Sequence, residues 1–321
     1  MLSVCRYSAE KKAEWDAFAR TAKNAHFFFQ RDYLEYHADR FVDHSLLFFQ
    51  DHKLTALLPA NVSGDKLVSH GGLTFGGFLV DASMTTRRML ELFAELMRYL
   101  RANGLTQLIY KCIPHIYHTL PAEEDRYALF LHGAHLSRRD MTSTIEIQAK
   151  LPFQERRRRG AKKAKSAGVC CRASEDLQAF WPLLEQNLRQ SHETRPAHSL
   201  AEIELLHRRF PDNIKLFGAY LDEQLLAGVL VYENAPVAHA QYISASEEGK
   251  RLGALDALFA WLITEVYNEK PRFDFGISTE DNGRLLNEGL IDQKEGFGAR
   301  GVVHDHYQLE VAAESTVAEA S

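Results

Sequence analysis

The hydrophobic pattern of residues 241–276 predicts a compact unit of strand, turn, helix and strand. Apolar residues recur at helical spacing along the predicted helix, at Leu255, Leu258, Phe259, Leu262, Ile263 and Val266. We therefore expect this helix to lie on a sheet. The preceding turn, Glu247 to Gly253, should leave backbone N–H groups free at a helix start, where a phosphate binds favourably. A strand, turn and helix of this kind predict a ligand site.

The rest of the pattern predicts the same order of elements in both halves of the chain. Each half is expected to run helix, helix, three strands, helix, strand, helix and strand. In the first half, elements are predicted at 11–40, 44–50, 54–62, 66–70, 89–100, 105–113 and 142–147. In the second half, around the unit already described, they are predicted at 177–190, 200–210, 214–221, 225–232, 237–244, 282–294 and 302–311.

This order predicts an α/β protein of the α+β type with two domains, at residues 1–150 and 151–321. Each domain should be a mixed, mostly antiparallel sheet flanked by helices. The second domain begins with a basic junction helix.

Composition narrows the classes of function. The net charge of −5 over 321 residues argues against general nucleic-acid binding, so no DNA partner is expected. No apolar run reaches the ~18 residues of a spanning helix, and the first residues lack the apolar core of a signal peptide. We therefore expect a cytoplasmic protein without a membrane span. Four cysteines without C-x-x-C spacing predict neither a disulfide framework nor a zinc site, and no metal is expected.

One basic run, residues 154–168, departs from this acidic balance. Its first interpretation is a solvated helix face. Its second is a clamp in which Arg158 and Lys162 bind phosphates of a nucleotide-linked or lipid-linked substrate. Contact with RNA also remains open.

Three motifs carry a resemblance to a known family. The strand at 142–147, followed by a basic helix ending Lys163-Ala164-Lys165-Ser166-Ala167-Gly168, is similar to a K-A-x-x-x-G signature. The segment His192-Glu193-Thr194-Arg195-Pro196, with His198 and Ser199, is similar to a substrate loop. Phe273-Asp274-Phe275-Gly276, running on to Asn287 and Lys294, is similar to a strand-and-helix ending. The chain thus resembles the GNAT acyltransferase superfamily, and in particular its FemAB-like branch with tandem GNAT-like repeats.

The resemblance implies an N-acyltransferase of two GNAT-like domains. The second repeat would hold acetyl-CoA or another acyl-CoA as donor, and the cleft between the repeats would hold an amine acceptor. The implied acceptor is an amino sugar or a peptide of a cell-envelope precursor. Some members of the family take the acyl group from aminoacyl-tRNA, but this chain lacks a long heptad-bearing insertion, which disfavours that donor. A non-catalytic binding protein on the same fold is the third alternative.

In the superfamily, the turn that binds the pyrophosphate of the donor usually has the pattern Q/R-x-x-G-x-G/A. Lys250 and Gly253 match its first and fourth positions, whereas Leu255 stands where a small residue is expected. Gly249 and Gly253 still allow the backbone to approach a phosphate. The residues expected to bind the donor are Ser244, Ala245, Gly249, Lys250, Arg251, Gly253 and Ala254.

Acyl transfer to an amine needs a base, a polarised carbonyl and a proton for the leaving group. Alternation along the strand at 237–244 predicts His239 and Gln241 on one face and Tyr242 and Ser244 on the other. His239 is either the base or an ordinary strand histidine, and Tyr242 is either a proton donor or a half-buried aromatic residue. Asp274 is either a base or acceptor ligand, or a helix cap. The residues expected to bind substrate are His70, Tyr110, Lys111, Arg158, Lys162, His192, Arg195, His198, Gln241, Asn287 and Lys294.

Overall fold

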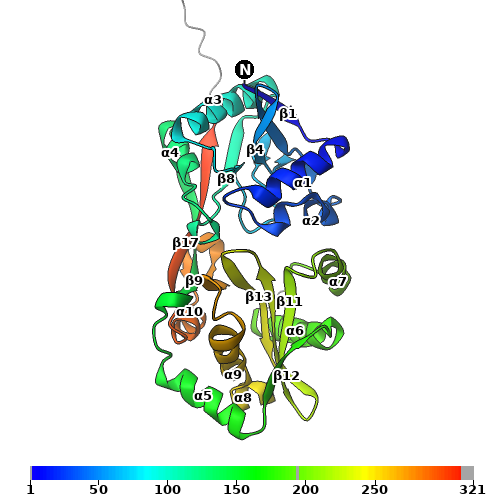
Figure 1. Cartoon of the computed structure of the whole chain (residues 1–321), viewed down its shortest axis with the longest axis vertical. Coiled ribbons are helices and arrows are strands. Elements are labelled where there is room, and N and C mark those ends of the chain that lie inside the picture. The colour runs from blue at the N-terminus through cyan, green and yellow to red at the C-terminus, as the bar shows by residue number, and fades with distance from the viewer. Residues whose placement is uncertain (1, 193–194, 312–321) are drawn as a thin grey trace, which may run out of the picture. The chain divides into compact units, whose positions relative to one another are not determined.

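The computed structural model describes residues 2–192 and 195–311, apart from the side chains of residues 190–192. The chain divides into two compact units: unit 1 is Met1–Arg139 with His304–Ser321, and unit 2 is Asp140–Val303. The chain passes between the units within two strands, β9 (His135–Glu146) and β17 (Arg300–Glu310) (Figure 1). The predicted boundary between the two repeats, after residue 150, stays a prediction. A repeat is a recurring order of helices and strands, whereas the two compact units are groups of residues in mutual contact.

The described part of unit 1 combines two groups of strands with four α-helices. The first group has the order β1-β3-β4-β7, formed by Leu2–Arg6, Leu46–Gln50, Lys53–Leu58 and Leu79–Val80. In the second group, β17 is followed by β8, β6, β5 and β2, which are Gln107–Lys111, Lys66–Val68, Asn61–Ser63 and Val42–Asp43. The helices are α1 (Lys12–Thr21), α2 (Arg31–Leu34), α3 (Thr86–Ala102) and α4 (Glu124–Leu131). Short 3₁₀ turns lie at Ala9–Lys11, Phe27–Phe29, Glu35–His37 and His115–Tyr117.

Helix α3 confirms the helix predicted from the apolar stripe at 89–100. All six apolar positions of the stripe are buried: Met89, Leu92, Phe93, Leu96, Met97 and Leu100. The side chain of Thr85 caps the helix by accepting a hydrogen bond from the Arg88 N–H. The chain then turns at Gly104, whose φ of 67° suits glycine.

Two predictions for unit 1 were wrong in detail. Residues 11–40, predicted as helical around a polar break near Lys23 and Asn24, form two α-helices, but α2 has only four residues and 3₁₀ turns replace the predicted α-helix on either side of it. Residues 54–62, predicted as one strand, form β4 and β5, which belong to different groups of strands. In the second case the long-range pairing of the strands decides the break, because the apolar pattern of residues 54–62 continues across it.

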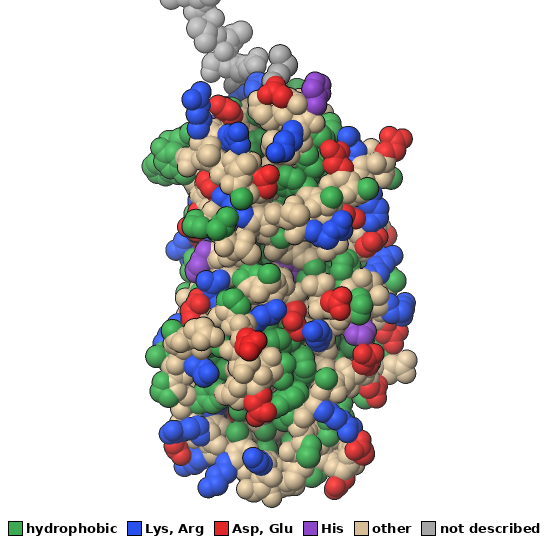
Figure 2. All heavy atoms as spheres, in the orientation of Figure 1, with side chains coloured by type: hydrophobic (Ala, Val, Ile, Leu, Met, Phe, Trp, Pro, Cys, Tyr) green, Lys and Arg blue, Asp and Glu red, His purple; other side chains and the backbone are tan. Residues whose placement is uncertain are grey.

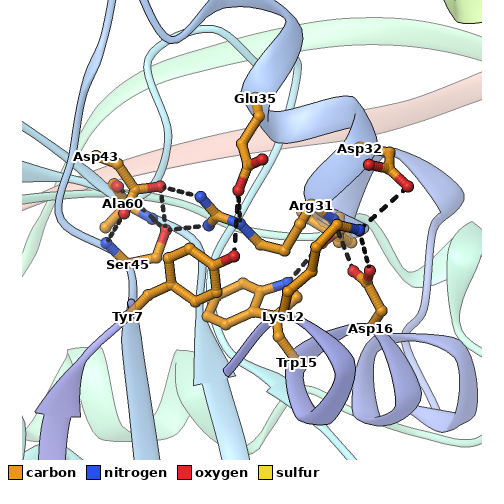
Figure 3. Close-up of polar contacts among 11 residues, drawn as sticks. Tyr7, Lys12, Trp15, Asp16, Arg31, Asp32, Glu35, Asp43, Ser45 and Ala60 are labelled. Carbon is orange, nitrogen blue, oxygen red and sulfur yellow. Dashed lines mark hydrogen bonds and ion pairs between the residues drawn. The ribbon is translucent and has the colours of Figure 1, made fainter. Parts of the chain in front are cut away.

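The guanidinium of Arg31 joins three segments of unit 1 (Figure 3). Its side chain is only 2% exposed and donates to Glu35 at 3.0 Å, to Ser45 at 3.2 Å and to Asp43 at 2.7 Å. The guanidinium carbon also lies 3.6 Å from the ring centroid of Tyr7. These charge-assisted contacts compensate the cost of removing the cation from water.

Replacing Arg31 with methionine should lower the free energy of unfolding by roughly 3 kcal/mol, because the partner carboxylates lose their buried cation. Urea unfolding measures the effect. The matched control is Arg87→Met, which removes an arginine that is 91% exposed and pairs with Glu91 on the surface. The control should change the free energy by less than about 0.5 kcal/mol. Equal losses in the two variants would contradict the structural role of Arg31.

Unit 2 is a sheet with helices on both faces. Its strand order is β10-β11-β12-β13-β14-β9, in which the first five strands are Cys170–Ser174, Ile214–Leu221, Gln224–Glu233, Val237–Ala245 and Arg272–Ile277. A small hairpin pairs β15 (Thr279–Glu280) with β16 (Leu285–Leu286). The described helices are α5 (Glu155–Ser166), α6 (Leu177–His192), α7 (Leu200–Arg209), α8 (Glu247–Leu252), α9 (Ala254–Trp261) and α10 (Glu288–Glu295). Across the residues with described positions, no helix has both the length and the apolar character needed to cross a bilayer.

Helix α9 lies on the sheet, as the apolar stripe predicts. Leu258 and Phe259 are buried there, and a π-helical turn at Leu262–Val266 continues the stripe. The turn predicted at Glu247 to Gly253 was wrong in form, because most of it is the short helix α8, capped by Ser246. Only Gly253 turns, with a φ of 82°, and it joins α8 to α9.

The helix predicted at 282–294 is shorter than expected. Helix α10 begins at Glu288, because Asp281 and Asn282 have positive φ angles and the hairpin of β15 and β16 occupies the preceding residues. Asn287 caps α10 by accepting a hydrogen bond from the Leu290 N–H.

Candidate active site

The parallel strands β13 and β14 pair over only three residues of each strand. The pairing runs from Val237 with Arg272 to His239 with Asp274 and ends there. The other neighbouring strands of unit 2 pair antiparallel. Beyond His239, a pocket of about 210 Å³ lies between the end of β13, Phe275 of β14 and helix α10. The edge of β13 that would face β14 is therefore turned toward a cavity.

A β-bulge at Gln241 sets the direction of the side chains of β13. In the pairing with β12, Leu230 faces Tyr242 while Val231 faces Ala240, so Gln241 is the extra residue. The prediction that His239 and Tyr242 lie on opposite faces was therefore wrong. The bulge shifts the alternation by one residue and places His239, Tyr242 and Ser244 on the same face.

His239 and Asp274 form a hydrogen-bonded pair at the last paired position of the two strands. The His239 Nδ1 lies 2.6 Å from Asp274 Oδ2, and the carboxylate is fully buried. On strand β9, the hydroxyls of Thr142 and Thr144 donate to Asp274 Oδ1 at 2.6 and 2.7 Å. The Gly276 N–H donates to Oδ2 at 3.2 Å. These hydrogen bonds fix the position of the Asp274 carboxylate.

This geometry fixes the tautomer of His239. An ionised carboxylate only accepts hydrogen bonds, so Nδ1 carries the proton and Nε2 of the neutral ring keeps its lone pair. The side chain of His239 is 13% exposed. Its Nε2 can therefore take a proton from a bound group, and Asp274 would stabilise the imidazolium that results.

Lys294 holds the turn that follows Asp274. Its ammonium is 4% exposed and donates at 2.8 Å to the carbonyl oxygens of Gly276 and Ile277 and to the hydroxyl of Ser278. Burial lowers the pKa of Lys294 to about 8, although the negative charge of Asp274 opposes that shift. Lys294 also lines the pocket beyond His239.

Replacing Lys294 with methionine should change how stability depends on pH. The folded chain has a Lys294 pKa of about 8, whereas an unfolded lysine titrates near about 10.4. Between these values the unfolded chain binds more protons, so the wild type gains stability as the pH rises. Relative to K294M, its free energy of unfolding should rise by roughly 2 to 3 kcal/mol between about pH 7.5 and pH 10. Urea unfolding of both proteins at the two pH values measures this, and a constant difference would argue against it.

The lining of the 210 Å³ pocket, called the wedge pocket below, is mainly apolar. Phe259, Phe275 and Phe297 pack against one another there, with ring centroids 5.0 to 5.7 Å apart. The remaining lining residues are Asn187, Ile243, Ser244, Ala245, Lys250, Leu255, Leu290, Gln293 and Lys294. Such a pocket suits an extended, largely aliphatic group that lies along the end of β13.

A second pocket of about 310 Å³ adjoins the first, since both are lined by Lys250, Leu255 and Gln293. We call it the polar pocket. Its other lining residues are Arg156, Arg157, Gly249, Gly253, Asp256, Gly289 and Asp292. The large side chain of Leu255, which departs from the family pattern, thus lies where the two pockets meet.

Close packing accounts for the glycines beside the polar pocket. A Cβ on Gly249 would lie 2.3 Å from the Leu226 carbonyl oxygen, and one on Gly253 would lie 2.5 Å from that of Gly160. A Cβ on Gly160 would lie 1.9 Å from Asp256. These three glycines let α8 and α9 approach strand β12 and helix α5, and so they form the shape of the site.

Comparison with known proteins identifies the fold. Residues 153–282 match the family described as the acetyltransferase (GNAT) domain. FemX is similar in structure over 94% of this chain and 96% of its own, with 11% identity and a TM-score of 0.66. L-PGS from Bacillus licheniformis is similar over 96% and 93%, with 13% identity and a TM-score of 0.63. A tandem GNAT protein from the clavulanic acid biosynthesis pathway is similar over 98% and 100%, with 15% identity and a TM-score of 0.52. No curated protein sequence matches the chain significantly.

The chain has a FemAB-like GNAT fold. Residues 153–282 are the part of the chain that matches the acetyltransferase (GNAT) family. The wedge pocket and the His239–Asp274 pair lie within unit 2, which contains this GNAT domain. In the described residues, no three His, Cys, Asp or Glu side chains are placed to hold a metal ion together.

The structure brings most of the predicted donor residues of the GNAT domain to the two pockets. Ser244, Ala245 and Lys250 line the wedge pocket, and Gly249, Lys250 and Gly253 line the polar pocket. Arg251 and Ala254 line neither of them. Arg251 pairs with Glu248, and Ala254 is buried at the start of α9.

Tyr242 contacts His198 on the face of β13 that also carries His239. Its hydroxyl lies 2.6 Å from His198 Nδ1 and accepts a hydrogen bond from the His198 N–H at 3.3 Å. Trp181 packs edge-on against the ring of Tyr242. Tyr242 and His198, which were predicted from different parts of the chain, are therefore in contact on the face of β13 that carries His239.

Five other predicted residues of unit 2 line neither of the two pockets. Arg158 and Lys162 are exposed on α5, and Arg195 is exposed after α6. Gln241 is the bulged residue of β13, and Asn287 is the cap of α10. The side chain of His192 lies outside the described part of the structure.

The predicted substrate residues of unit 1 are buried. The Tyr110 hydroxyl donates to Asp125 and accepts from the Phe78 N–H, both at 2.7 Å. Lys111 donates to the carbonyl oxygens of His70 and Leu73. Burial lowers the pKa of His70 to about 3, so this imidazole is neutral at neutral pH. Substrate contact by these three residues stays a prediction.

Several residues of the site were not found from the sequence. Thr142 and Thr144 alternate along β9 and thus share a face, but their contact with Asp274 depends on strand register. Asn187, which donates to the carbonyl oxygen of Ala245 at 2.8 Å, gives no signal within helix α6. Arg156 and Arg157 belong to the basic run, but the pattern does not distinguish them from their neighbours.

Proposed function

We propose that this chain is an N-acyltransferase that moves an acyl group from a pantetheine thioester such as acyl-CoA to an amine. The observation that carries the proposal is the His239–Asp274 pair at the point where β13 and β14 separate around the wedge pocket. The histidine can serve as the base of this reaction, the apolar pocket can hold an acyl donor, and residues 153–282 match an acetyltransferase domain.

In the proposed reaction, the acceptor first loses a proton from its ammonium group to become a nucleophile. The amine nitrogen then attacks the thioester carbonyl, and the C–N bond forms as the C–S bond breaks. His239 Nε2 accepts the proton that the attacking nitrogen gives up and returns it to the sulfur of the leaving thiolate. Of the two protons lost by the nitrogen, one leaves with the thiol and the other is released to solvent.

The wedge pocket supports a pantetheine donor. Pantetheine is an extended chain with two amide groups, and β13 beyond His239 has no pairing with β14. The open edge of β13 can therefore form strand-like hydrogen bonds with those amides. The phenylalanines on the other side of the pocket would contact the aliphatic part of the chain.

The proposal for the acceptor is based on the family resemblance. We propose an amine of an amino sugar or of a peptide in a cell-envelope precursor as the acceptor. Residues 1–150 would form the acceptor side and residues 151–321 the donor side. Because acyl-CoA and nucleotide-linked precursors are cytoplasmic metabolites, the proposed compartment is the cytoplasm.

Calorimetric titration with acetyl-CoA and octanoyl-CoA tests donor binding. We expect binding by the wild type and its loss in Leu290→Trp, because the indole would fill the wedge pocket that Leu290 lines. The matched control is Leu286→Trp, on an exposed leucine that does not line the pocket. Absence of heat with both thioesters at high concentration would remove the donor half of the proposal.

The second candidate is transfer from aminoacyl-tRNA, and the basic helix α5 is the observation that favours it. Filter binding with charged tRNA decides between the donors. Retention of charged tRNA together with transfer of its amino acid would replace the thioester proposal. The third candidate, a non-catalytic binding protein, predicts no thiol release from any thioester with any amine.

A further inference from the structure

The exposed face of helix α5 forms a basic surface that begins at the mouth of the polar pocket. We propose that it docks an acidic carrier protein, which presents the acyl group on its own 4′-phosphopantetheine arm. This inference rests on the proposed function, because it specifies how the thioester reaches the wedge pocket. Free acyl-CoA would then be a weaker donor than the acylated carrier.

The cations of the polar pocket are already paired. Three of the described residues that line it carry positive charge, and each has a carboxylate partner. Arg156 contacts Asp292 at 2.5 Å and Arg157 contacts Asp256 at 2.6 Å. Lys250 contacts Glu247 at 2.6 Å.

Because these cations are already paired, the polar pocket favours an acyl donor that places little negative charge there. The pyrophosphate and 3′-phosphate of CoA carry several negative charges and would compete with Asp256 and Asp292 for the same arginines. The single phosphodiester that joins pantetheine to a carrier protein has one negative charge. The polar pocket, with its arginines neutralised, therefore matches the phosphodiester better than the pyrophosphate.

Helix α5 separates its packing face from its charged face. Arg157, Gly160 and Ala164 face inward, where Arg157 pairs with Asp256 of α9, Gly160 leaves no space for a side chain and Ala164 is fully buried. On the outward face, the helical positions 158, 162 and 165 follow one another at spacings of four and three residues, flanked by 159. These exposed side chains are Arg158, Arg159, Lys162 and Lys165.

Most cations on the outward face of α5 are not engaged in ion pairs with described residues. Arg158 pairs with Glu155, within the same helix. For Arg159, Lys162 and Lys165, the described residues provide no ion-pair partner. Figure 2 shows Lys and Arg side chains gathered at the lower left of the molecule, where Figure 1 draws α5. This face can therefore attract an acidic partner at the point where the pantetheine arm must enter.

The same face fits a protein better than RNA. The eight helical residues from Arg158 to Lys165 span only about 10 Å, which is comparable to the contact made by one acidic helix. Single-stranded RNA is commonly held by aromatic side chains as well as by cations, and α5 contains no aromatic residue. The net charge of −5 for the whole chain also argues against a broad RNA surface.

Donor competition tests the inference. The same octanoyl group is offered on an acidic acyl carrier protein, on CoA and on free pantetheine, with one amine acceptor. We expect kcat/KM to be at least about tenfold higher for the carrier than for CoA, with an advantage that disappears at high salt. In Arg159→Glu/Lys165→Glu, the value for the carrier should fall roughly tenfold, while that for octanoyl-pantetheine stays unchanged.

The matched control, Lys53→Glu/Arg208→Glu, makes the same change in net charge at two exposed positions outside α5. It should leave all three donors unaffected. Anisotropy of a labelled carrier gives a binding readout that does not depend on turnover. Equal or better use of CoA, or an equal loss with all donors, would overturn the inference but leave the proposed function intact. If the protein transfers the amino acid of charged tRNA and the α5 variant abolishes that transfer, the carrier-protein inference is also overturned. If none of the three thioesters supports transfer, the proposed function itself is wrong.

Discussion

Replacing His239 with glutamine should lower kcat for amide formation by about 10²–10⁴-fold, the usual contribution of a general base. The amide of glutamine has nearly the size of imidazole but cannot accept a proton at neutral pH. The KM for the thioester should change little, because His239 does not line the wedge pocket. Steady-state kinetics with the thioester as the varied substrate measure both quantities.

The matched control for this variant is His135→Gln, which replaces an exposed histidine on β9. It should leave kcat unchanged, and both variants should melt close to the wild type. A His239 variant that keeps its fold and retains more than about a tenth of the wild-type kcat would exclude His239 as the base.

Replacing Asp274 with asparagine should lower kcat by about 10²–10⁴-fold while the KM for the thioester stays within a factor of a few. Asparagine offers one acceptor oxygen, which Thr142 and Thr144 already engage in the wild type. Its NH₂ group would then face His239 and favour the tautomer whose Nε2 carries the proton. In the proposed reaction, Asp274 would be a positioning residue that acts through His239.

Thr144→Val is the graded control for Asp274. It removes one of the two hydroxyls that donate to Asp274 Oδ1 and leaves the one from Thr142. We expect kcat to fall by about tenfold or less. A larger loss for Thr144→Val than for Asp274→Asn, or a rise in KM without a change in kcat, would contradict the positioning role.

The sequence predicted those parts of the fold that a regular apolar pattern determines. Helix α3 and the strands β11 and β12 begin and end within three residues of their predicted ranges. The apolar residues of each of these elements face one hydrophobic core, so the spacing of apolar residues in the sequence matches the positions that are buried. Residues 11–40 carry no such period, and their path depends on Arg31, whose partners Asp43 and Ser45 come from a later segment. Local patterns contain no information about such contacts.

The site was predictable in its residue types but not in its geometry. His239, Tyr242 and Asp274 were candidates because they stand on central strands. The bulge at Gln241 reversed the expected faces, since one extra residue in a strand leaves no mark on its apolar pattern. The contact of His239 with Asp274 depends on the parallel register of β13 and β14, which are separated in sequence by two helices.

The most direct test of the central claim is to measure thiol release together with the mass of the product, for the wild type with an acyl thioester and a panel of amines. The account predicts thiol release that requires a suitable amine and equals, mole for mole, the amide formed. Release of thiol without an amide would show hydrolysis instead of acyl transfer. No release with any combination of thioester and amine, including the acylated carrier protein, would contradict the account.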